Sequence, residues 1–244
     1  MKNDLGSSRM GLLFFLLTLV VALLSWIGSI YGVGEVQSLL SAEGIRWVLG
    51  HVVSNYVQCP ALGLMLILFM GGGIVVQSGL YDILKRYCRK EKQLSRKERR
   101  ALVSASVALL VYTIGIALSV CLPGNFLLSV TGSWLHSPLA EGFVYILSVG
   151  VGLTGMVYGY VSDTFRSIMD VVQSMASLIA SRAFSLVTLF FVVQFFSSLM
   201  YTHLAEWTGV SNDIVHMVYF VCCFLTVFKF PLFTRALKNK VRDT

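Results

Sequence analysis

Six apolar runs, each about 20 residues long, limit what this chain can fold into. They cover roughly residues 10–31, 60–80, 101–122, 142–161, 183–202 and 214–233. A helix needs about 20 apolar residues to cross the ~30 Å hydrocarbon core of a bilayer. Pro123 and Gly124 follow the third run, and Ser137 and Pro138 precede the fourth, so polar residues separate the runs. The chain is therefore predicted to be an all-α membrane protein with about six transmembrane helices.

The composition supports this class and excludes others. Of the 244 residues, 56% are hydrophobic and 13% are charged, which is about half the charged share of a soluble domain. The net charge of +7 equals the excess of nine Lys/Arg over two Glu within residues 85–100 alone. A basic loop between spans is typical of a topology signal, with attraction to anionic lipid as a second role. Membrane lipid is the expected partner, and nucleic acid is not.

The placement of Lys and Arg predicts the orientation. With the N-terminus inside, 18 of the 19 cations lie on the inner side, and Arg46 is the exception. Positive residues concentrate on the cytoplasmic side of membrane proteins. We expect a multi-pass protein of the cell inner (plasma) membrane with both termini in the cytoplasm. The first apolar run is interpreted as an anchor that stays, because it is too long for a signal peptide.

Two further segments have the pattern of amphipathic helices lying in the membrane interface. In residues 42–57 the apolar face is predicted to hold Ile45, Val48, Leu49, Val52 and Tyr56, opposite Glu43, Arg46, Gly50 and Ser54. In residues 164–182 it is predicted to hold Phe165, Ile168, Val172, Met175 and Ile179, opposite Arg166, Asp170, Ser174, Ser177 and Ser181. Ser41 suits the N-cap of the first helix. We expect the two helices on opposite sides of the membrane.

Both amphipathic segments follow a run that ends in the same pattern, GxxYG, at residues 28–32 and 155–159. The spans after them both contain Val-Val-Gln, at 75–77 and 192–194. These matches favour a degenerate inverted repeat, an arrangement common among secondary transporters. The predicted division is a first repeat remnant over 1–84, a cytoplasmic basic loop over 85–100, and a second half over 101–244. Chance matches and ordinary small-residue packing are the alternative interpretation.

Few polar residues lie inside the runs, so candidate site residues are few. Gln194 is the best candidate to contact a substrate, followed by Tyr158, although a helix–helix hydrogen bond would also explain a buried Gln194 amide. The candidates for close helix packing are Gly28, Gly32, Gly71, Gly72, Gly73, Gly155 and Gly159. Catalytic motifs such as HExxH, GxSxG and GxxxxGK do not occur in the sequence. We expect no enzyme, no metal and no cofactor.

Four blocks of the sequence resemble the p-aminobenzoyl-glutamate transporter (AbgT) family. They are SLLSAEGIRWVLGHVVSN with LGLMLILFMGGGIVVQSGL after it, LSRKERRALVSASVALLVYTIGIALSVCLPG, GLTGMVYGYVSDTFRSIMDVVQSM and LVTLFFVVQFFSSLMYTHL. Together they cover most of residues 22–204. The family's re-entrant hairpin signatures, SNxxSD and SASAKW, do not occur in this sequence. The chain therefore resembles a short form of the family without the hairpin segments.

The resemblance implies transport of aminobenzoyl-glutamate-like organic anions by a homodimer. The alternative is a transport-inactive scaffold, or an oligomerising accessory protein, that lost the transport hairpins. The runs contain no acidic side chain that could couple a proton, and this favours the alternative. Both interpretations stay open at the level of the sequence.

Overall fold

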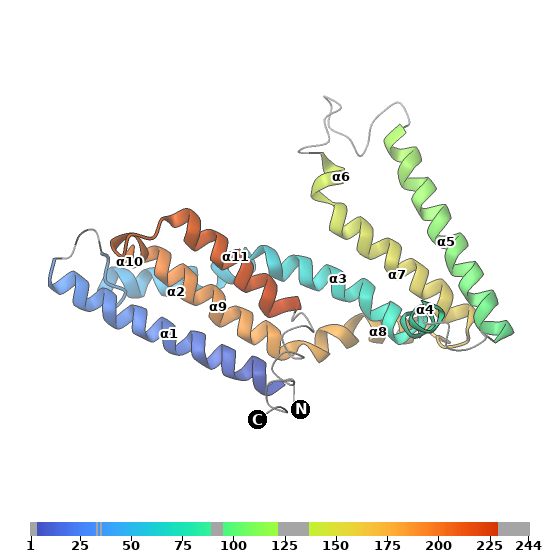
Figure 1. Ribbon diagram of the computed structural model, residues 1–244, viewed down its shortest axis with the longest axis horizontal. Helices are drawn as coiled ribbons and strands as arrows, with labels where there is room; N and C mark the ends of the chain where they lie inside the picture. The colour runs from blue at the N-terminus through green and yellow to red at the C-terminus, as the bar shows by residue number, and fades with distance from the viewer. Residues whose placement is uncertain (1–3, 33, 35, 89–94, 122–136, 229–244) are drawn as a thin grey trace. The chain divides into compact units, whose positions relative to one another are not determined.

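The computed structural model describes residues 4–32, 34, 36–88, 95–121 and 137–228, and the regular elements in these ranges are all helices (Figure 1). In chain order they are α1 (Asp4–Ile30), α2 (Ala42–Val57), α3 (Pro60–Gln77), α4 (Leu80–Cys88), α5 (Arg96–Cys121), α6 (Pro138–Glu141), α7 (Phe143–Val161), α8 (Ile168–Ser181), α9 (Ala183–Tyr201), α10 (Leu204–Trp207) and α11 (Asn212–Phe228). The protein is an all-α membrane protein, as predicted.

The chain divides into two compact units. The terminal unit consists of residues 1–63 and 182–244, and the central unit of residues 64–181. The first and the last part of the chain thus both contribute to the terminal unit. These units are defined by packing, whereas the predicted division into 1–84, 85–100 and 101–244 followed the repeat along the sequence.

In the terminal unit, α1 and α11 both pack along α9 (Figure 1). The rings of Phe14 in α1 and Phe195 in α9 have centroids 5.6 Å apart. The segment after α1 is tied to both helices. The N–H of Leu39 donates to Ser25 Oγ at 3.1 Å, and the N–H of Gln37 donates to the carbonyl of Thr202 at 3.2 Å. These bonds satisfy the backbone N–H groups of Gln37 and Leu39, as non-helical backbone beside membrane spans requires.

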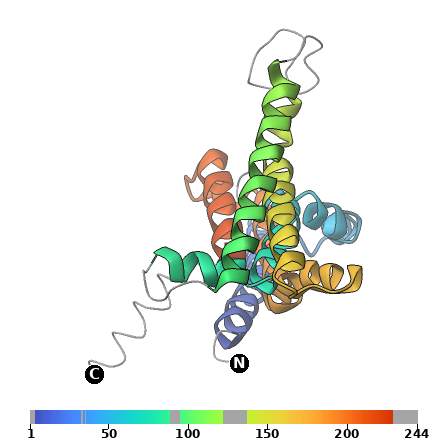
Figure 2. The same cartoon turned by 90° about the vertical axis from the view of Figure 1, so that its right-hand side faces the viewer.

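In the central unit, α5 and α7 lie side by side (Figure 2). The hydroxyl of Tyr112 in α5 donates to the carbonyl of Ile146 in α7 at 2.7 Å. Gly150 makes room for this ring, since a Cβ there would lie 2.6 Å from Tyr112 Cε1. On another side of α7, Ser148 Oγ donates to the carbonyl of Ile67 in α3. Hydrogen bonds and small residues therefore join these apolar helices, as expected in a bilayer.

The two halves of the chain share one order of elements. The first half of the chain runs through an apolar helix, an amphipathic helix, a second apolar helix, a short helix and a further long helix, which are α1 to α5. The second half repeats this order in α7 to α11. The terminal unit combines α1 and α2 with α9, α10 and α11, whereas the central unit combines α7 and α8 with α4, α5 and most of α3. The order of elements predicted for three helices is thus shared by five helices of each half, and each unit takes helices from both halves.

Four apolar helices end in the same way, on a residue with positive φ. This residue is Gly32 after α1, Gly79 after α3, Asp163 after α7 and His203 after α9. In each case its N–H donates to the carbonyl three residues earlier, at 3.2–3.4 Å. The left-handed conformation closes the last turn of a helix. After α7 the N–H of Thr164 also reaches the carbonyl of Gly159 at 2.9 Å, which completes a Schellman motif.

These helix ends correct one argument for the repeat. Gly32 follows the end of α1, whereas Gly159 lies inside α7 and Asp163 holds the position that corresponds to Gly32. Tyr31 is 79% exposed and Tyr158 is 2% exposed. The two GxxYG patterns are therefore not equivalent in the fold. The two Val-Val-Gln patterns also differ in place, since Gln77 ends α3 and Gln194 lies in the middle of α9.

The first amphipathic helix has the predicted bounds, and Ser41 Oγ accepts the N–H of Gly44 at 3.0 Å as its N-cap. Its apolar face is divided, however. Val48, Val52 and Tyr56 are half-buried, whereas Leu49 is 77% exposed. The exposed part forms a stripe of Ile45, Leu49, Val53 and Val57. One side of α2 thus packs in the protein, and a second apolar side remains available for lipid.

The second amphipathic helix packs in the protein through part of its predicted polar face. Ser174, on that polar face, is 5% exposed, and its carbonyl lies where a Cβ of Gly73 would be. Ile168, on the predicted apolar face, is 77% exposed. Between helices in a membrane, small residues pack closely and apolar ones can face lipid. The rule that apolar residues point inward therefore fails for this helix.

Five helical segments in the described residues are long and apolar enough to cross a membrane. They are Arg9–Ile30, Ala42–Gln77, which is α2 with α3, Arg96–Cys121, Phe143–Val161 and Ala183–Tyr201. Each contains or matches one of the first five predicted spans. The sixth was predicted over 214–233. Its counterpart α11 is shorter, at 17 residues, and positions 229–233 lie outside the described residues.

Candidate functional site

Gln194, the first predicted substrate contact, is used in helix packing. It lies in the middle of α9, and its Nε2 donates to the carbonyl of Val52 in α2 at 2.9 Å. One turn further along α2, the hydroxyl of Tyr56 donates to the carbonyl of Leu186 at 3.1 Å. These two bonds join α2 to α9. The geometry therefore matches the alternative interpretation, in which the Gln194 amide forms a helix–helix hydrogen bond.

Tyr158, the second predicted substrate contact, is part of a buried cluster. Its side chain is 2% exposed and packs with Leu80, Ile83, Ala101 and Ala105. These neighbours come from α4 and α5, so the tyrosine lies where three helices of the central unit meet. Gln194 belongs to the terminal unit and Tyr158 to the central unit. The two predicted contacts thus belong to different packing environments.

Most of the predicted packing glycines make close contacts. A Cβ at Gly71 would meet the carbonyl of Ser148, and one at Gly155 would lie 3.1 Å from the N of Val75. The tight neighbours of the others are the carbonyl of Ser174 for Gly73, the side chain of Leu178 for Gly72, the ring of Phe165 for Gly159 and the side chain of Val36 for Gly28. Gly32 is different, because nothing in the described chain lies within 4 Å of its Cβ position. Its positive φ, rather than packing, accounts for glycine there.

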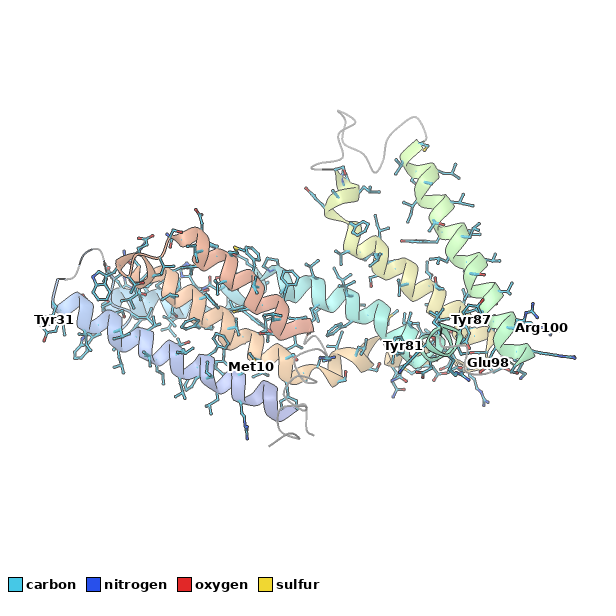
Figure 3. The ribbon with its side chains drawn as sticks, viewed as in Figure 1. Met10, Tyr31, Tyr81, Tyr87, Glu98 and Arg100 are labelled. Carbon is cyan, nitrogen blue, oxygen red and sulfur yellow. The ribbon has the colours of Figure 1, made fainter. Side chains whose placement is uncertain are left out.

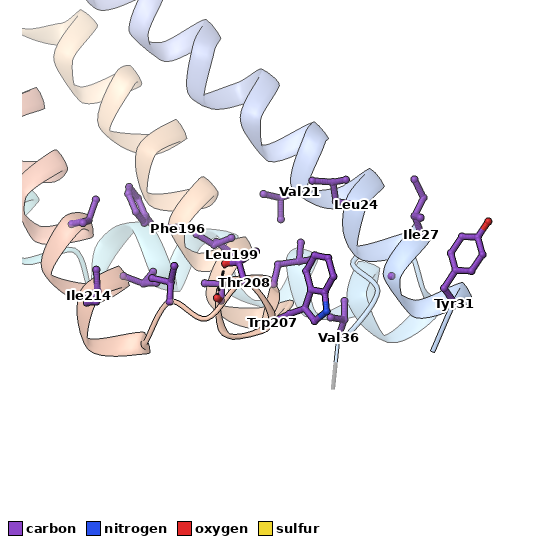
Figure 4. A pocket seen from close by; sticks show the side chains of 16 residues that line it. Val21, Leu24, Ile27, Tyr31, Val36, Phe196, Leu199, Trp207, Thr208 and Ile214 are labelled. Atoms are coloured by element: carbon purple, nitrogen blue, oxygen red, sulfur yellow. Dashed lines mark hydrogen bonds between the residues drawn. The ribbon is translucent and has the colours of Figure 1, made fainter. Parts of the chain in front are cut away.

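An apolar hollow of about 520 Å³ lies within the terminal unit, between the end of α1 and the start of α11 (Figure 4). Leu24 and Ile27 of α1 line it together with Phe196 and Leu199 of α9. None of the lining residues is charged. Trp207, which is 61% exposed, stands at its edge. The hollow is suited to hydrocarbon rather than to a charged substrate.

A second hollow of about 520 Å³, in the central unit, has a polar lining. Its walls are formed by the end of α3, by the segment before α8 and by α8, with residues Gln77, Thr164, Phe165, Asp170, Gln173, Ser174, Ala176, Ser177 and Ala180. The side chains of Gln77 and Gln173 are exposed in it. Amide groups can donate and accept hydrogen bonds, so this hollow is the better candidate for a polar ligand.

Asp170 supplies a negative charge to the polar hollow. Its Oδ2 accepts the N–H groups of Arg166 and Ser167, both at 2.9 Å. These two bonds, that of Arg166 first, hold the pKa of Asp170 below its usual value of 3.8. The carboxylate is therefore charged at neutral pH.

Sequence reasoning missed the polar hollow. Gln77 was considered only as part of the Val-Val-Gln match, and Gln173 was assigned to neither face of its helix. The signal available was two amides, Gln77 near the end of an apolar run and Gln173 inside the second amphipathic segment. The described residues contain no group of three or more His, Cys, Asp or Glu side chains that could hold a metal ion.

Comparison with known proteins decides the family. The sequence pattern of the AbgT putative transporter family matches residues 9–91 and 85–227. The chain belongs to this family. The match covers both halves of the repeat, so the family assignment does not rest on one segment. The AbgT resemblance of the four sequence blocks is confirmed.

Two solved AbgT-family transporters show the same fold. The YdaH transporter of Alcanivorax borkumensis, reported to have an unusual topology, has a TM-score of 0.71 at 18% identity, over 82% of this chain and 74% of that chain. MtrF of Neisseria gonorrhoeae, reported to illuminate a class of antimetabolite efflux pumps, has a TM-score of 0.71 at 15% identity, over 90% of this chain and 79% of that chain. No curated protein matches the sequence.

Proposed function

We propose that this AbgT-family protein moves an organic anion of the aminobenzoyl-glutamate type across the inner membrane. The observation that carries the proposal is the family match over nearly all of residues 9–227. The five apolar helical segments support a transmembrane path, and the fold shared with YdaH and MtrF supports the same class of activity. Because MtrF is described as an efflux pump, export is as much part of the proposal as uptake.

The first substrate contacts to test are the amides of the polar hollow. Gln77 and Gln173 are exposed there, whereas Gln194 is bonded to Val52 and Tyr158 is buried among apolar side chains. An anion needs hydrogen-bond donors, and each amide supplies two, which must outweigh the repulsion from the Asp170 carboxylate in the same hollow. Gln194 and Tyr158 remain the contacts proposed from the sequence, and Gln194 is included in the same test.

A second function is favoured by a separate observation. Polar side chains within the apolar helices are bonded to backbone carbonyls, as for Tyr112 with Ile146, Ser148 with Ile67 and Gln194 with Val52. A side chain that already has a partner contributes less to a substrate site. The alternative is therefore a transport-inactive membrane scaffold or oligomerising accessory protein of the AbgT family.

Transport in proteoliposomes separates the two functions. The purified protein is reconstituted into liposomes, and labelled p-aminobenzoyl-glutamate is placed either inside or outside them. A proton or sodium gradient is then imposed in each direction. Gradient-dependent flux supports the transporter. No flux in either direction, from protein that retains its thermal unfolding transition, favours the scaffold.

Variants then locate the contacts. Gln77→Ala with Gln173→Ala is expected to lower flux without changing the unfolding temperature, because both side chains are exposed. Gln194→Ala is expected to lower the unfolding temperature as well, because its hydrogen bond is lost. If only Gln194→Ala loses flux, and its stability is unchanged, Gln194 is the substrate contact rather than Gln77 and Gln173.

We further propose that the protein is a homodimer with both termini in the cytoplasm. The exposed apolar side chains of α1 and α5, among them Leu12, Leu16, Val103 and Val111, offer a surface that lipid or a second copy could cover. Mass measurement in detergent by light scattering tests the dimer. A monomeric mass at all protein concentrations would contradict it.

A further inference from the structure

The start of α5 carries more positive charge than its acidic neighbours neutralise. Two of its charged groups are paired: Glu98 contacts Arg86 at 3.1 Å, and Lys97 contacts Asp163 at 3.1 Å. Glu98 also accepts the N–H of Ser95 at 2.8 Å, which closes the first turn. The acids near this helix end are therefore already bonded.

Three arginines remain beside these pairs. Arg96, Arg99 and Arg100 are exposed, and no ion pair links them to an acid within the described ranges. They lie in the first turns of α5, where the helix dipole is positive and favours anions. Three cations at this end repel one another and the dipole. A bound anion would relieve both repulsions.

The three arginines share one face with a long aliphatic stripe. At 100° per residue they lie above Val103 and Val107, which are 56% and 55% exposed. Together with Ser104 these residues line a shallow hollow of about 580 Å³. The stripe continues along the exposed side of the helix through Leu110, Ile114 and Leu118. A polar, positively charged end thus leads directly into an apolar surface.

The neighbouring helix α4 indicates the depth of this site in the membrane. It crosses the first turns of α5 in the central unit (Figures 2 and 3). Ile83 packs inward at 4% exposed, whereas Tyr81 and Tyr87 are 53% and 62% exposed. Tyrosine is enriched at the level of the lipid headgroups. Because Arg86 of α4 pairs with Glu98 of α5 at 3.1 Å, the start of α5 with Arg100 then lies near headgroup level.

We propose that Arg96, Arg99 and Arg100 bind the phosphate of an anionic phospholipid whose acyl chain lies along Val103 and Val107. A guanidinium group can form two parallel hydrogen bonds to a phosphate, which suits this ligand better than a point charge. The exposed aliphatic stripe provides an apolar surface along which the acyl chain can lie. A free phosphate ion would leave the stripe unused.

Lipid binding to the full-length protein tests the proposal. Protein in a neutral detergent is titrated with phosphatidylglycerol, and bound lipid is counted by native mass spectrometry. Phosphatidylcholine and inorganic phosphate are titrated in parallel. We expect phosphatidylglycerol to bind, and to raise the unfolding temperature more than either of the other two.

The key variant replaces Arg96, Arg99 and Arg100 by Gln. At roughly fivefold for each arginine beside an anionic lipid, affinity for phosphatidylglycerol should fall roughly a hundredfold. The matched control replaces Arg9, Arg46 and Arg166 by Gln, because these three exposed arginines lie elsewhere and remove the same charge. The control should bind as the wild type does.

A lysine variant at the three positions keeps the charge without the paired hydrogen bonds, so its affinity should lie between the wild type and the Gln variant. The proposal is overturned if the Gln variant and the control bind alike. It is also overturned if inorganic phosphate or phosphatidylcholine matches phosphatidylglycerol in the wild type.

Discussion

Glycine determines how closely α3 approaches its neighbours in the central unit. At Gly71 a carbonyl oxygen of α7 lies where a Cβ would be, and at Gly73 a carbonyl oxygen of α8 does so. Neither oxygen can move without its whole helix. Gly115 in α5 has open space instead, with nothing within 4 Å of the Cβ position. The same residue type therefore serves packing at two positions and not at the third.

Gly71→Ala and Gly73→Ala should each destabilise the protein by about 1–3 kcal/mol, because the added methyl overpacks a rigid contact. Gly115→Ala is the matched control. It should leave stability unchanged or raise it by up to about 1 kcal/mol, since alanine is the better helix former. Thermal unfolding in detergent measures all three. Equal effects at the three positions would show that the close contacts do not matter.

Gln194 shows how one polar side chain can join two helices. Its amide reaches a carbonyl of α2 across the interface with α9, and such bonds between membrane helices contribute about 0.6 kcal/mol on average. Gln77 has the same two preceding residues in the sequence but is exposed at the end of α3. A comparison of Gln194 with Gln77 therefore separates the effect of the hydrogen bond to Val52 from the effect of having a glutamine at that position.

Gln194→Ala should therefore destabilise the protein by about 1 kcal/mol, from the lost hydrogen bond and the smaller side chain. Gln77→Ala should change stability little. The unfolding temperatures of the two variants, compared with the wild type, provide the measurement. A Gln194→Ala protein as stable as the wild type would argue that the bond to Val52 is unimportant and would strengthen the substrate role.

At the scale of the element, the start of α8 is defined by a reciprocal cap. Ser167 Oγ accepts the N–H of Asp170 at 3.3 Å, and Asp170 Oδ2 accepts the N–H of Ser167 at 2.9 Å. This is a capping box with aspartate in place of glutamate. It explains why α8 begins at Ile168, whereas apolar periodicity predicted a start at residue 164. Apolar periodicity indicates which face of a helix is apolar, but it does not indicate at which residue the helical hydrogen bonds begin.

The cap predicts a pH effect. Because the pKa of Asp170 is lowered in the folded protein, its bonds stabilise the fold above the usual value of 3.8, and this stability is lost as the pH falls through the lower, folded-state pKa. The unfolding temperature of the wild type should thus decrease between pH 5 and about pH 2 by more than that of Asp170→Asn. Asp213→Asn, near the start of α11, removes a carboxylate outside this cap and is the control.

At the scale of the whole molecule, the two halves exchange their last three helices, which begin with the second apolar helix of each half. α1 packs on α9, and α7 packs on α3 through Gly71 and Ser148. Each unit is complete only when both halves of the chain have been made. The exchange also explains why a division along the sequence and a division by packing differ.

The orientation in the membrane is a further prediction for the whole molecule. We expect residues 85–100 and both termini in the cytoplasm, because 18 of the 19 cations agree with that topology. Ser95→Cys, in a protein with Cys88 and Cys121 replaced by serine, should react with a membrane-impermeant thiol reagent only after cells are permeabilised. Glu43→Cys should react in intact cells. The reverse pattern would contradict the topology.

The sequence by itself determined where the long helices lie and identified the five apolar segments that can cross a membrane. The bounds of α2, its cap at Ser41 and the five long apolar segments could be predicted, because transfer into lipid depends on a local run of residues. The family also followed from the order of four blocks along the chain, without any knowledge of their contacts.

Only the tertiary structure decided which helix packs on which, and through which face. Ser174 packs inward and Ile168 is exposed because helices in lipid gain little from hiding apolar surface and more from close backbone contact and hydrogen bonds. The partners of Gly71, Gly73 and Gln194 lie in helices far along the chain. Such contacts leave no periodic signal, so the polar hollow at Gln77 and Gln173 could be found only once the helices were in place.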